Sequence, residues 1–374
     1  MSWDILKIPL LEKWKTWWIQ RHPDEIGEYS WVYLFERGKQ IRPKLFCELW
    51  SYLCKDRPPC IELAFIIECI HVATLILDDC PWMDNANQRR GWETLHSKFS
   101  CKKSFLIGHD IIHMAYLIFT SHPIEYYAKE ITESDLEQII RQKSYRLWKG
   151  QLMDLRGSGS LFELASMKTG VLFELVTETV AICVGLDRDF WRLWGNHLGV
   201  LFQWMDDWND REEDKQLGQR NAFNENEKST LLAYSELWNQ LSQSIGSSWF
   251  ERPFGAFMKS YFTDSLPLEL SSVEASSISS LLISQPIPLM EYKDMDEERC
   301  LKYKKGIYFM QQIQPYFSMK MDIPREKWFL KTNLWEIPEK DWRDQSEIDE
   351  WIKLYPWTEG LYTLLDTDDP DFRD

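Results

Sequence analysis

The feature that most constrains the fold is an apolar run from Ile61 to Leu77 that ends in two adjacent carboxylates, Asp78 and Asp79. Its length and composition are typical of a buried helix. Ionised carboxylates at the end of such a helix cost several kcal/mol of desolvation unless a cation or a donor neutralises them. A bound divalent metal ion is the simplest neutraliser, so the sequence indicates a metal site at this helix end.

A second acidic segment has the same construction. The mostly apolar stretch from Leu201 to Met205 runs into Asp206 and Asp207, and Asp210 follows. Asp206 and Asp210 are four residues apart, so they project from one helix face. Without a partner they would repel each other, whereas a shared metal ion would make the arrangement favourable. Two such segments facing each other would bind several cations.

The first segment contains a third acid, Asp84, which follows Asp79 after Pro81. A regular helix turns by about 100° per residue, which would place Asp84 on a different face from Asp79. We therefore expect the chain to bulge or to end the helix here, so that Asp84 can return to the acidic pair.

Composition excludes several classes of function. The 374 residues carry 43 Lys and Arg against 59 Asp and Glu, a net charge of −16, which argues against electrostatic binding to nucleic acid or an anionic membrane. The sequence shows neither a signal peptide nor an uncharged run long enough for a membrane span. Its eight cysteines form no CxxC pair and are expected to be reduced, structural thiols. A cytoplasmic enzyme is the expectation.

The periodicity predicts a mostly helical chain. Residues 44–77 form two expected helices with a break at 55–59, and further helical spacing covers 104–120, 131–148, 161–185 and 190–209. Polar groups at Gly150-Gln151 and Lys168-Thr169-Gly170 are expected to interrupt helices. A polar loop is expected at 211–227 before a helix that opens at Lys228. We divide the chain into an N-terminal helical segment (1–37), a catalytic domain (38–300) and a Trp-rich C-terminal extension (301–374).

Two groups of cations accompany the acidic segments. Lys39 and Arg42 lie three residues apart between a glycine and a proline, so both can be presented to one anion; a surface loop is the alternative. Arg89 and Arg90 follow the first acidic segment, and arginine binds phosphate oxygens bidentately. His71 lies two turns before Asp78 near the same helix face, which fits either a ligand contact or a satisfied core histidine.

Taken together, these residues resemble the trans-type isoprenyl diphosphate synthase family over roughly residues 35–300. The family's DDxxxxD motif matches Asp78 to Asp84, and its RRG matches Arg89 to Gly91. Its second motif, FQxxDDxxD, matches Phe202 to Asp210. Further family elements occur in the same order and spacing: Gly38-Lys39 with Arg42-Pro43, His71, Gly150-Gln151 and Lys168-Thr169-Gly170.

The resemblance implies an all-α, isoprenoid synthase-type helical bundle around a central apolar cavity, with the two acidic motifs facing each other across its mouth. It implies a homodimeric prenyltransferase that joins isopentenyl diphosphate to an allylic prenyl diphosphate. In such a reaction, metal ions and cationic side chains neutralise the leaving diphosphate, so that the C–O bond ionises to an allylic cation in a dry pocket. The alkene of isopentenyl diphosphate then attacks this cation.

The resemblance also implies roles for individual residues. About three Mg²⁺ ions would be bound by Asp78, Asp79, Asp84, Asp206, Asp207 and Asp210. The allylic diphosphate and the cation formed from it would be supported by Arg89, Lys168, Thr169 and Gln203. The diphosphate of isopentenyl diphosphate would be bound by Lys39, Arg42, His71 and Arg90. The residues expected to be catalytic are Asp78, Asp79, Lys168, Thr169, Gln203 and Asp206.

The chain also departs from the family pattern. Gln40 stands where the family often has arginine, and Gln219 stands where a lysine commonly contacts the allylic diphosphate. The absence of a lysine at position 219 favours an alternative, a terpene synthase of the same family type that ionises and cyclises a prenyl diphosphate. The aromatic faces of Trp82, Trp204 and Trp208 could then stabilise carbocations. A non-catalytic partner subunit is a third possibility, against which the intact acidic motifs argue.

The resemblance implies that the residues one turn before the first acidic motif limit the length of an elongation product. Here they are Ala73 and Thr74, both small. In the family, bulky aromatic residues at these positions stop growth early. The sequence therefore predicts a product of about twenty carbons or more, because small side chains leave room for a chain of isoprene units.

Overall fold

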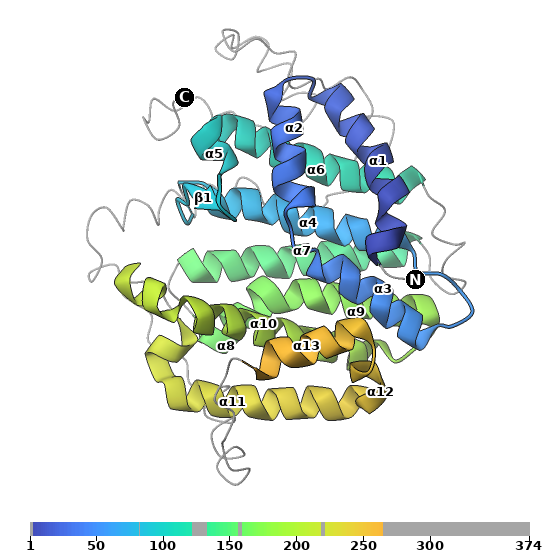
Figure 1. Ribbon diagram of the computed structural model, residues 1–374, viewed down its shortest axis with the longest axis vertical. Coiled ribbons are helices and arrows are strands. Elements are labelled where there is room, and N and C mark those ends of the chain that lie inside the picture. Colours follow the sequence, from blue (N-terminus) through green and yellow to red (C-terminus); the bar gives the residue numbers. More distant parts are fainter. Residues whose placement is uncertain (1–2, 82, 122–132, 156–158, 218–220, 265–374) are drawn as a thin grey trace. The chain divides into compact units, whose positions relative to one another are not determined.

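The computed structural model describes residues 3–81, 83–121, 133–155, 159–217 and 221–264 (Figure 1). Nearly all of the Ser- and Pro-rich stretch at 264–290 and the whole of the Trp-rich extension at 301–374 lie outside these residues. So do Trp82 and Gln219. None of the helices in the described ranges combines the length and the apolar character that a bilayer span requires.

The described residues form an all-α fold, as predicted. The first half comprises α1 (Trp3–Arg21), α2 (Glu25–Trp31), the π-helix η1 (Val32–Glu36), α3 (Ile41–Leu53), α4 (Ile61–Asp79), β1 (Gln88–Arg89), β2 (Trp92–Glu93), α5 (Leu95–Lys98) and α6 (Cys101–Ser121). The second half comprises α7 (Glu133–Leu155), α8 (Leu161–Ala165), the π-helix η3 (Ser166–Gly170), α9 (Val171–Val184), α10 (Arg188–Leu217), α11 (Ala222–Ile245), α12 (Ser247–Phe250) and α13 (Pro253–Thr263). The two-residue strands β1 and β2 are the only strands among the described residues.

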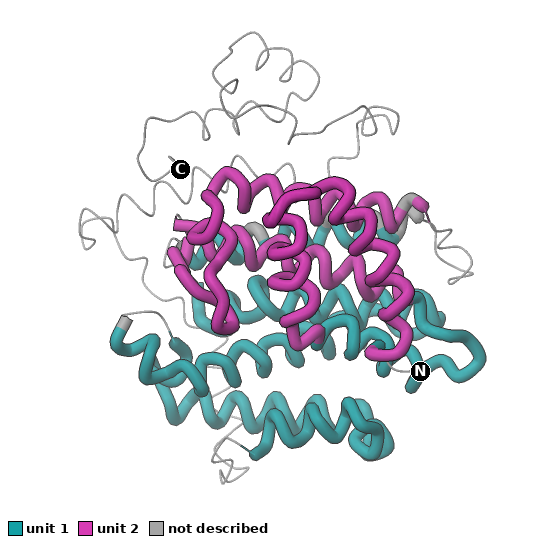
Figure 2. Tube along the Cα trace, turned by 45° about the horizontal axis from the view of Figure 1, so that its top comes forward, with its two compact units in different colours: residues 1–3, 41–60, 123–294 teal, residues 4–40, 61–122, 295–374 magenta. Residues whose placement is uncertain are grey.

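The chain divides into two compact units (Figure 2). Unit 1 comprises residues 1–3, 41–60 and 123–294, and unit 2 comprises residues 4–40, 61–122 and 295–374. Each unit is therefore assembled from separate stretches of sequence, and each contains one of the two acidic motifs. The division at residues 38 and 301 proposed from the sequence cuts the chain into consecutive segments, and it stays a prediction.

Unit 2 is built around α4 and α6, which lie side by side (Figure 1). The break predicted at 55–59 is confirmed, because α3 ends at Leu53 and α4 begins at Ile61. Most side chains of α4 are buried, which explains its nearly continuous apolar sequence. Burial of these side chains places the carboxylates at its last turn next to an apolar core.

Unit 1 is built around α9 and α10, which pack at very short range (Figure 1). A Cβ atom added to Gly199 of α10 would lie 2.5 Å from Cα of Gly170, and one added to Gly195 would lie 2.0 Å from Oγ1 of Thr177. Only glycine permits this approach. The hydroxyl of Thr177 also donates to the carbonyl oxygen of Trp191 at 2.6 Å, which fixes the two helices in register.

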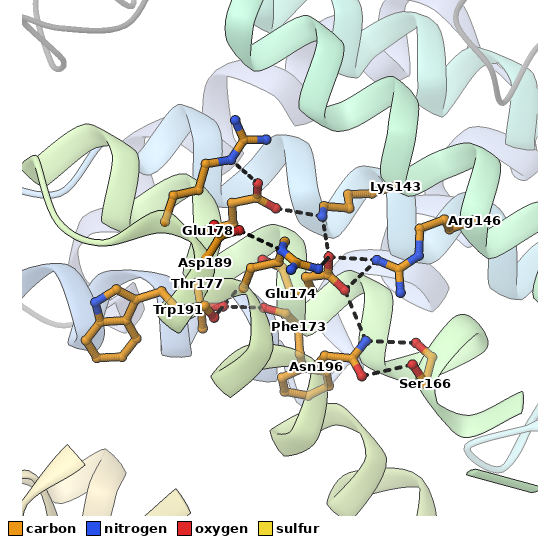
Figure 3. A network of polar contacts seen from close by, with 12 residues as sticks. Lys143, Arg146, Ser166, Phe173, Glu174, Thr177, Glu178, Asp189, Trp191 and Asn196 are labelled. Carbon is orange, nitrogen blue, oxygen red and sulfur yellow. Dashed lines mark hydrogen bonds and ion pairs between the residues drawn. The ribbon is translucent and has the colours of Figure 1, made fainter. Parts of the chain in front are cut away.

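A buried ion network joins α7, α9 and α10 (Figure 3). Glu174 and Glu178 of α9 are both buried and both form ion pairs with Lys143 of α7, at 2.6 Å for Glu178. Glu174 also accepts from Arg146 at 2.7 Å and from Asn196 at 3.0 Å. Buried carboxylates are tolerated only with such partners, so the network fixes the relative placement of three helices within unit 1.

The prediction of a polar loop at 211–227 is wrong. Helix α10 continues to Leu217, and α11 begins at Ala222, capped by Asn221, whose Oδ1 accepts from the N–H groups of Phe223 at 3.0 Å and Asn224 at 3.2 Å. The charged run from Arg211 onward has no apolar periodicity, but its Glu, Lys and Gln residues are good helix formers on an exposed face. The helix expected at Lys228 corresponds to the second part of α11, after a kink at Asn226.

The seven cysteines within the described residues are free thiols, and all but Cys101 are buried. This agrees with the expectation of reduced, structural thiols for that part of the chain. Burial raises the pKa of the Cys69, Cys80 and Cys183 thiols, which keeps them protonated.

Candidate active site

The first acidic motif lies at the end of α4, where Asp78 and Asp79 are the last two helical residues. The chain then folds back over the helix end. The N–H of Asp84 donates to the carbonyl oxygen of Asp78 at 2.9 Å, and the N–H of Ala86 donates to that of Asp79 at 3.0 Å. The helix therefore ends, as expected from the longer spacing, and the Asp84 main chain returns to the acidic pair, with its side chain exposed.

Both carboxylate oxygens of Asp79 have donors. The Tyr33 hydroxyl donates to Oδ2 at 2.8 Å, and Nε of Arg89 donates to Oδ1 at 2.7 Å. Asp79 is only 2% exposed. Burial raises its pKa above the ordinary value, and Arg89 and Tyr33 offset part of this effect. The sequence did not predict Tyr33 as a site residue, because an aromatic residue in a buried helix is indistinguishable from core packing.

The two arginines are presented by the β1–β2 hairpin. Arg89 pairs with Trp92, and the two-residue turn between them has positive φ at both positions, 56° for Arg90 and 77° for Gly91. Turns of this kind match the twist of short antiparallel strands. The hairpin follows the acidic motif directly, so it places Arg89 against Asp79. Arg90, at the turn, lies near Gly38 instead.

Arg90 lies against the turn that carries Lys39. A Cβ atom added to Gly38 would lie 3.1 Å from Nη1 of Arg90 and 3.7 Å from Oε1 of Glu68. Burial lowers the pKa of Arg90, although the guanidinium stays charged near neutral pH. Lys39 is exposed, and His71, one turn after Glu68 on α4, is partly buried. Unit 2 thus brings Arg90 to the Gly38-Lys39 turn beside α4.

In unit 1 the second acidic motif lies within α10. Asp206 and Asp210 are exposed and share a helix face, and the Tyr261 hydroxyl of α13 donates to Oδ1 of Asp206 at 3.2 Å. Asp207 accepts from Nε2 of Gln203 at 2.9 Å and from the N–H of Ala222 at 3.1 Å. Burial raises the pKa of Asp207 to about 6, despite these two donors.

Lys168 and Thr169 lie in the π-helix η3, between α8 and α9. The Thr169 hydroxyl donates to Oε1 of Gln203 at 2.6 Å, and Lys168 forms an ion pair with Asp154 of α7. A single π-helical turn inserts an extra residue and is often found at functional sites. The prediction that Gly150-Gln151 interrupts a helix is wrong, because α7 runs through both residues; Gly150 instead allows α7 to approach Met167 of η3.

Arg42 belongs to α3 in unit 1, and its guanidinium carbon lies 5.0 Å from the ring centre of Phe173 on α9. A cation over an aromatic face keeps its charge while its position is fixed. Of the tryptophans proposed for a cyclase, Trp204 and Trp208 lie among the described residues. Trp204 packs edge-on against Phe162, and the Trp208 ring contacts Phe223 and the guanidinium of Arg211.

The donor set suits a hard divalent cation. The residues described in the two units contain no group of three or more His, Cys, Asp and Glu side chains arranged to hold a metal ion by themselves. Mg²⁺, however, is commonly bound by one or two protein carboxylates together with substrate phosphate and water. The carboxylate pairs at residues 78–79 and 206–207 fit that manner of binding, with cations nearby for the phosphate.

The all-α fold, the two acidic segments and their accompanying cations agree with the family resemblance found in the sequence. The polyprenyl synthetase family model matches residues 24–245, more than half of the chain, and the chain belongs to this family. An isoprenoid synthase family member from Thermotoga neapolitana has the same fold, with a TM-score of 0.55 and 23% sequence identity over 68% of this chain and 98% of that one.

Curated relatives match part of the chain. The geranylgeranyl diphosphate synthase of Cereibacter sphaeroides is 28% identical over 174 residues, covering 46% of this chain and 60% of the relative. The farnesyl diphosphate synthase of Geobacillus stearothermophilus is 30% identical over 180 residues, covering 46% of this chain and 61% of the relative. The chain therefore spans about three fifths of the length of these relatives.

Proposed function

We propose that the protein is a Mg²⁺-dependent prenyltransferase that condenses isopentenyl diphosphate with an allylic diphosphate to give a longer prenyl diphosphate. The observation that carries the proposal is the placement of Arg90 against the Gly38-Lys39 turn. Arg89 already contacts the first acidic motif, so unit 2 holds a second group of cations apart from Asp79. Elongation needs two diphosphate sites, whereas cyclisation needs one.

The first diphosphate is that of the allylic substrate. Mg²⁺ would be held by the six motif aspartates, where it supplies Lewis-acid stabilisation of the leaving diphosphate. Arg89 and Lys168 would add donors to that diphosphate. Thr169 and Gln203 would direct oxygen dipoles toward the developing allylic cation.

The second diphosphate is that of isopentenyl diphosphate, and its proposed ligands are Lys39, Arg42, His71 and Arg90. Arginine binds such oxygens through two parallel N–H groups, and lysine adds a point charge. Fixing this diphosphate positions the alkene for attack on the allylic carbon, which converts a bimolecular step into an effectively intramolecular one.

Product length and assembly belong to the same proposal. The matched relatives are named for farnesyl and geranylgeranyl products. The small side chains at Ala73 and Thr74 support a product of about twenty carbons or more, since they leave room beyond a shorter chain. A homodimer, a set of three Mg²⁺ ions and a cytoplasmic location are further parts of this proposal, supported by the family resemblance.

Steady-state kinetics of Arg90→Gln test the assignment of the second diphosphate. We expect the KM for isopentenyl diphosphate to rise by about tenfold or more, because a charge-assisted contact contributes about 1.5–3 kcal/mol, while the KM for the allylic substrate changes little. Arg37→Gln is the matched control, since Arg37 stacks on Trp92 at the same surface. Equal effects of Arg90→Gln on both KM values would remove the support for a separate second site.

A further inference from the structure

Two residues with different expected ligands bind each other in this protein. Asp79 is proposed to bind Mg²⁺ and Arg89 to bind diphosphate, yet Nε of Arg89 donates to Oδ1 of Asp79 at 2.7 Å. The other oxygen of Asp79 accepts from Tyr33 at 2.8 Å. Each carboxylate oxygen has a second lone pair, so what decides whether a metal ion can bind Asp79 is the charge and the mobility of these two donors.

The two donors differ in charge. The Tyr33 phenol is neutral, and burial together with the nearby Asp79 charge raises its pKa, so it stays a hydroxyl donor. A neutral donor can remain on a carboxylate that also binds a metal ion. The Arg89 guanidinium is a full positive charge, and at contact distance in a partly buried site it would repel a divalent cation by several kcal/mol.

The two donors also differ in their freedom to move. Tyr33 lies in the π-helix η1, is 4% exposed, and stacks on Tyr29 with ring centres 6.2 Å apart. Arg89 lies on the two-residue strand β1, next to a tight turn, and its side chain is 28% exposed. Tyr33 is therefore fixed by packing, whereas Arg89 can turn toward solvent or a ligand without disturbing the core.

We propose that a divalent metal ion and Arg89 compete for Asp79, while Tyr33 holds the carboxylate in place in both states. This inference rests on the proposed function, because it concerns the same metal and diphosphate. Displacement of Arg89 by the metal makes the guanidinium available to diphosphate. Diphosphate in turn draws Arg89 away from Asp79 and favours metal binding.

Competition of this kind couples two ligands. By thermodynamic linkage, diphosphate must raise metal affinity by the same factor by which metal raises diphosphate affinity. Metal alone should bind weakly, since it must break the Asp79–Arg89 ion pair without compensation for the arginine. Arg89 then occupies the metal's place at Asp79 until the metal ion and diphosphate are both present. Tyr33 is a positioning residue, because it holds the Asp79 carboxylate.

The test is titration of the full-length protein with Mn²⁺, with free Mn²⁺ followed by electron paramagnetic resonance. The titrations use a background carrying Asp206→Asn, Asp207→Asn and Asp210→Asn, so that the second motif has no carboxylate left to bind a metal ion. Each variant is measured with and without inorganic pyrophosphate. Circular dichroism and the melting temperature establish that each variant is folded.

Arg89→Gln should bind Mn²⁺ alone about tenfold more tightly than the background protein, a change within the range typical of coupled sites. The same substitution should reduce the enhancement by pyrophosphate. Arg89→Lys keeps a cation and should leave affinity for Mn²⁺ alone low. If Arg89→Gln binds Mn²⁺ alone no more tightly than the background protein does, Arg89 does not compete for Asp79 and the proposal is wrong.

Tyr33→Phe keeps the buried ring and removes only the hydroxyl. Its Mn²⁺ affinity should fall by about fivefold with pyrophosphate present, because Asp79 loses the donor that orients it. Tyr29→Phe is the matched control, since it removes a hydroxyl that donates to the main-chain oxygen of Glu93, and its Mn²⁺ affinity should not change. A purely structural Tyr33 would lower the melting temperature of Tyr33→Phe without changing Mn²⁺ affinity, which would overturn its positioning role.

An activity assay separates this proposal from the proposed function. If the wild-type protein elongates an allylic diphosphate but Arg89→Gln shows no gain in affinity for Mn²⁺, only the proposed competition between Arg89 and the metal ion is wrong. If no variant binds Mn²⁺ with pyrophosphate and the wild-type protein elongates nothing, both proposals fail.

Discussion

Thr169 donates its hydroxyl proton to Oε1 of Gln203 at 2.6 Å, and Nε2 of Gln203 donates to Asp207 at 2.9 Å. This chain of donors links the π-helix η3 to the second acidic motif. Because an ionised carboxylate only accepts, Asp207 sets the orientation of the Gln203 amide, with Nε2 toward Asp207 and Oε1 toward Thr169. The Thr169 hydroxyl then holds the amide in this position by donating to Oε1.

Thr169→Val should therefore lower kcat by about tenfold with little change in fold, because valine has the shape of threonine but cannot donate to Gln203. Thr169→Ser should keep most of the activity. The measurement is kcat for both variants alongside their melting temperatures. A loss of stability in Thr169→Val with an unchanged kcat would assign Thr169 a structural role only.

Asp207 predicts a pH dependence of stability. Burial raises its pKa to about 6 in the folded protein, against 3.8 as the ordinary value. The folded protein therefore binds the Asp207 proton more tightly than the unfolded chain does. Proton binding stabilises the folded state at low pH, and this stabilisation is lost as pH rises through about 6. Between about pH 5 and pH 8 the unfolding free energy of the wild-type protein should fall by about 1 kcal/mol relative to Asp207→Asn.

The comparison is made by urea denaturation with a chelator present, since a metal ion at Asp207 would itself lower the pKa. Asp207→Asn carries no titrating group at this position, so it serves as the reference for the wild-type protein at each pH. A difference between the two proteins that is the same at both pH values would contradict the raised pKa of Asp207.

The buried network in unit 1 predicts a large loss of stability. Lys143→Met leaves Glu174 and Glu178 with one cation fewer in the core, which should cost about 3–5 kcal/mol. Arg192→Gln is the control, because Arg192 is 42% exposed and lies 3.8 Å from Glu174, so its loss should cost less than about 1 kcal/mol. Denaturant midpoints measure both, and similar losses in the two variants would show that burial does not decide the effect.

Thr74 offers a test of product length. It is buried on α4, and its hydroxyl donates to the carbonyl oxygen of His71 at 2.7 Å. Thr74→Phe should shorten the product by at least one isoprene unit, because the larger ring fills space one turn before Asp78. Thr74→Val has nearly the same volume as the wild-type residue and should leave the product unchanged. An unchanged product from a folded, active Thr74→Phe would refute the assignment of Thr74 to the end of the substrate chain.

Much of the helical fold could be predicted from the sequence, because α4 and the helices around residues 170–209 carry continuous apolar patterns. The ending of α4 before Asp84 could also be predicted, since the extra residues after Asp79 cannot stay on one face of a helix. The extension of α10 to Leu217 could not, because an exposed charged helix has no apolar period to reveal it.

The contacts of the candidate site were less predictable. Motif spacing identified Asp79 and Arg89 but could not show that they bind each other. Tyr33 and Asp154 gave no signal, because each is separated in sequence from its partner and neither belongs to a recognisable motif. Such long-range pairs depend on how helices pack, which a single sequence does not specify.

Chain elongation is tested by paired incubations of the purified protein with Mg²⁺ and geranyl, farnesyl or geranylgeranyl diphosphate, each with and without isopentenyl diphosphate. Both the aqueous and the hexane-extractable products are analysed. We predict longer prenyl diphosphates that form only when isopentenyl diphosphate is present. Hydrocarbons or alcohols formed from the allylic substrate alone, with no longer diphosphate in any incubation, would contradict elongation and identify a terpene synthase.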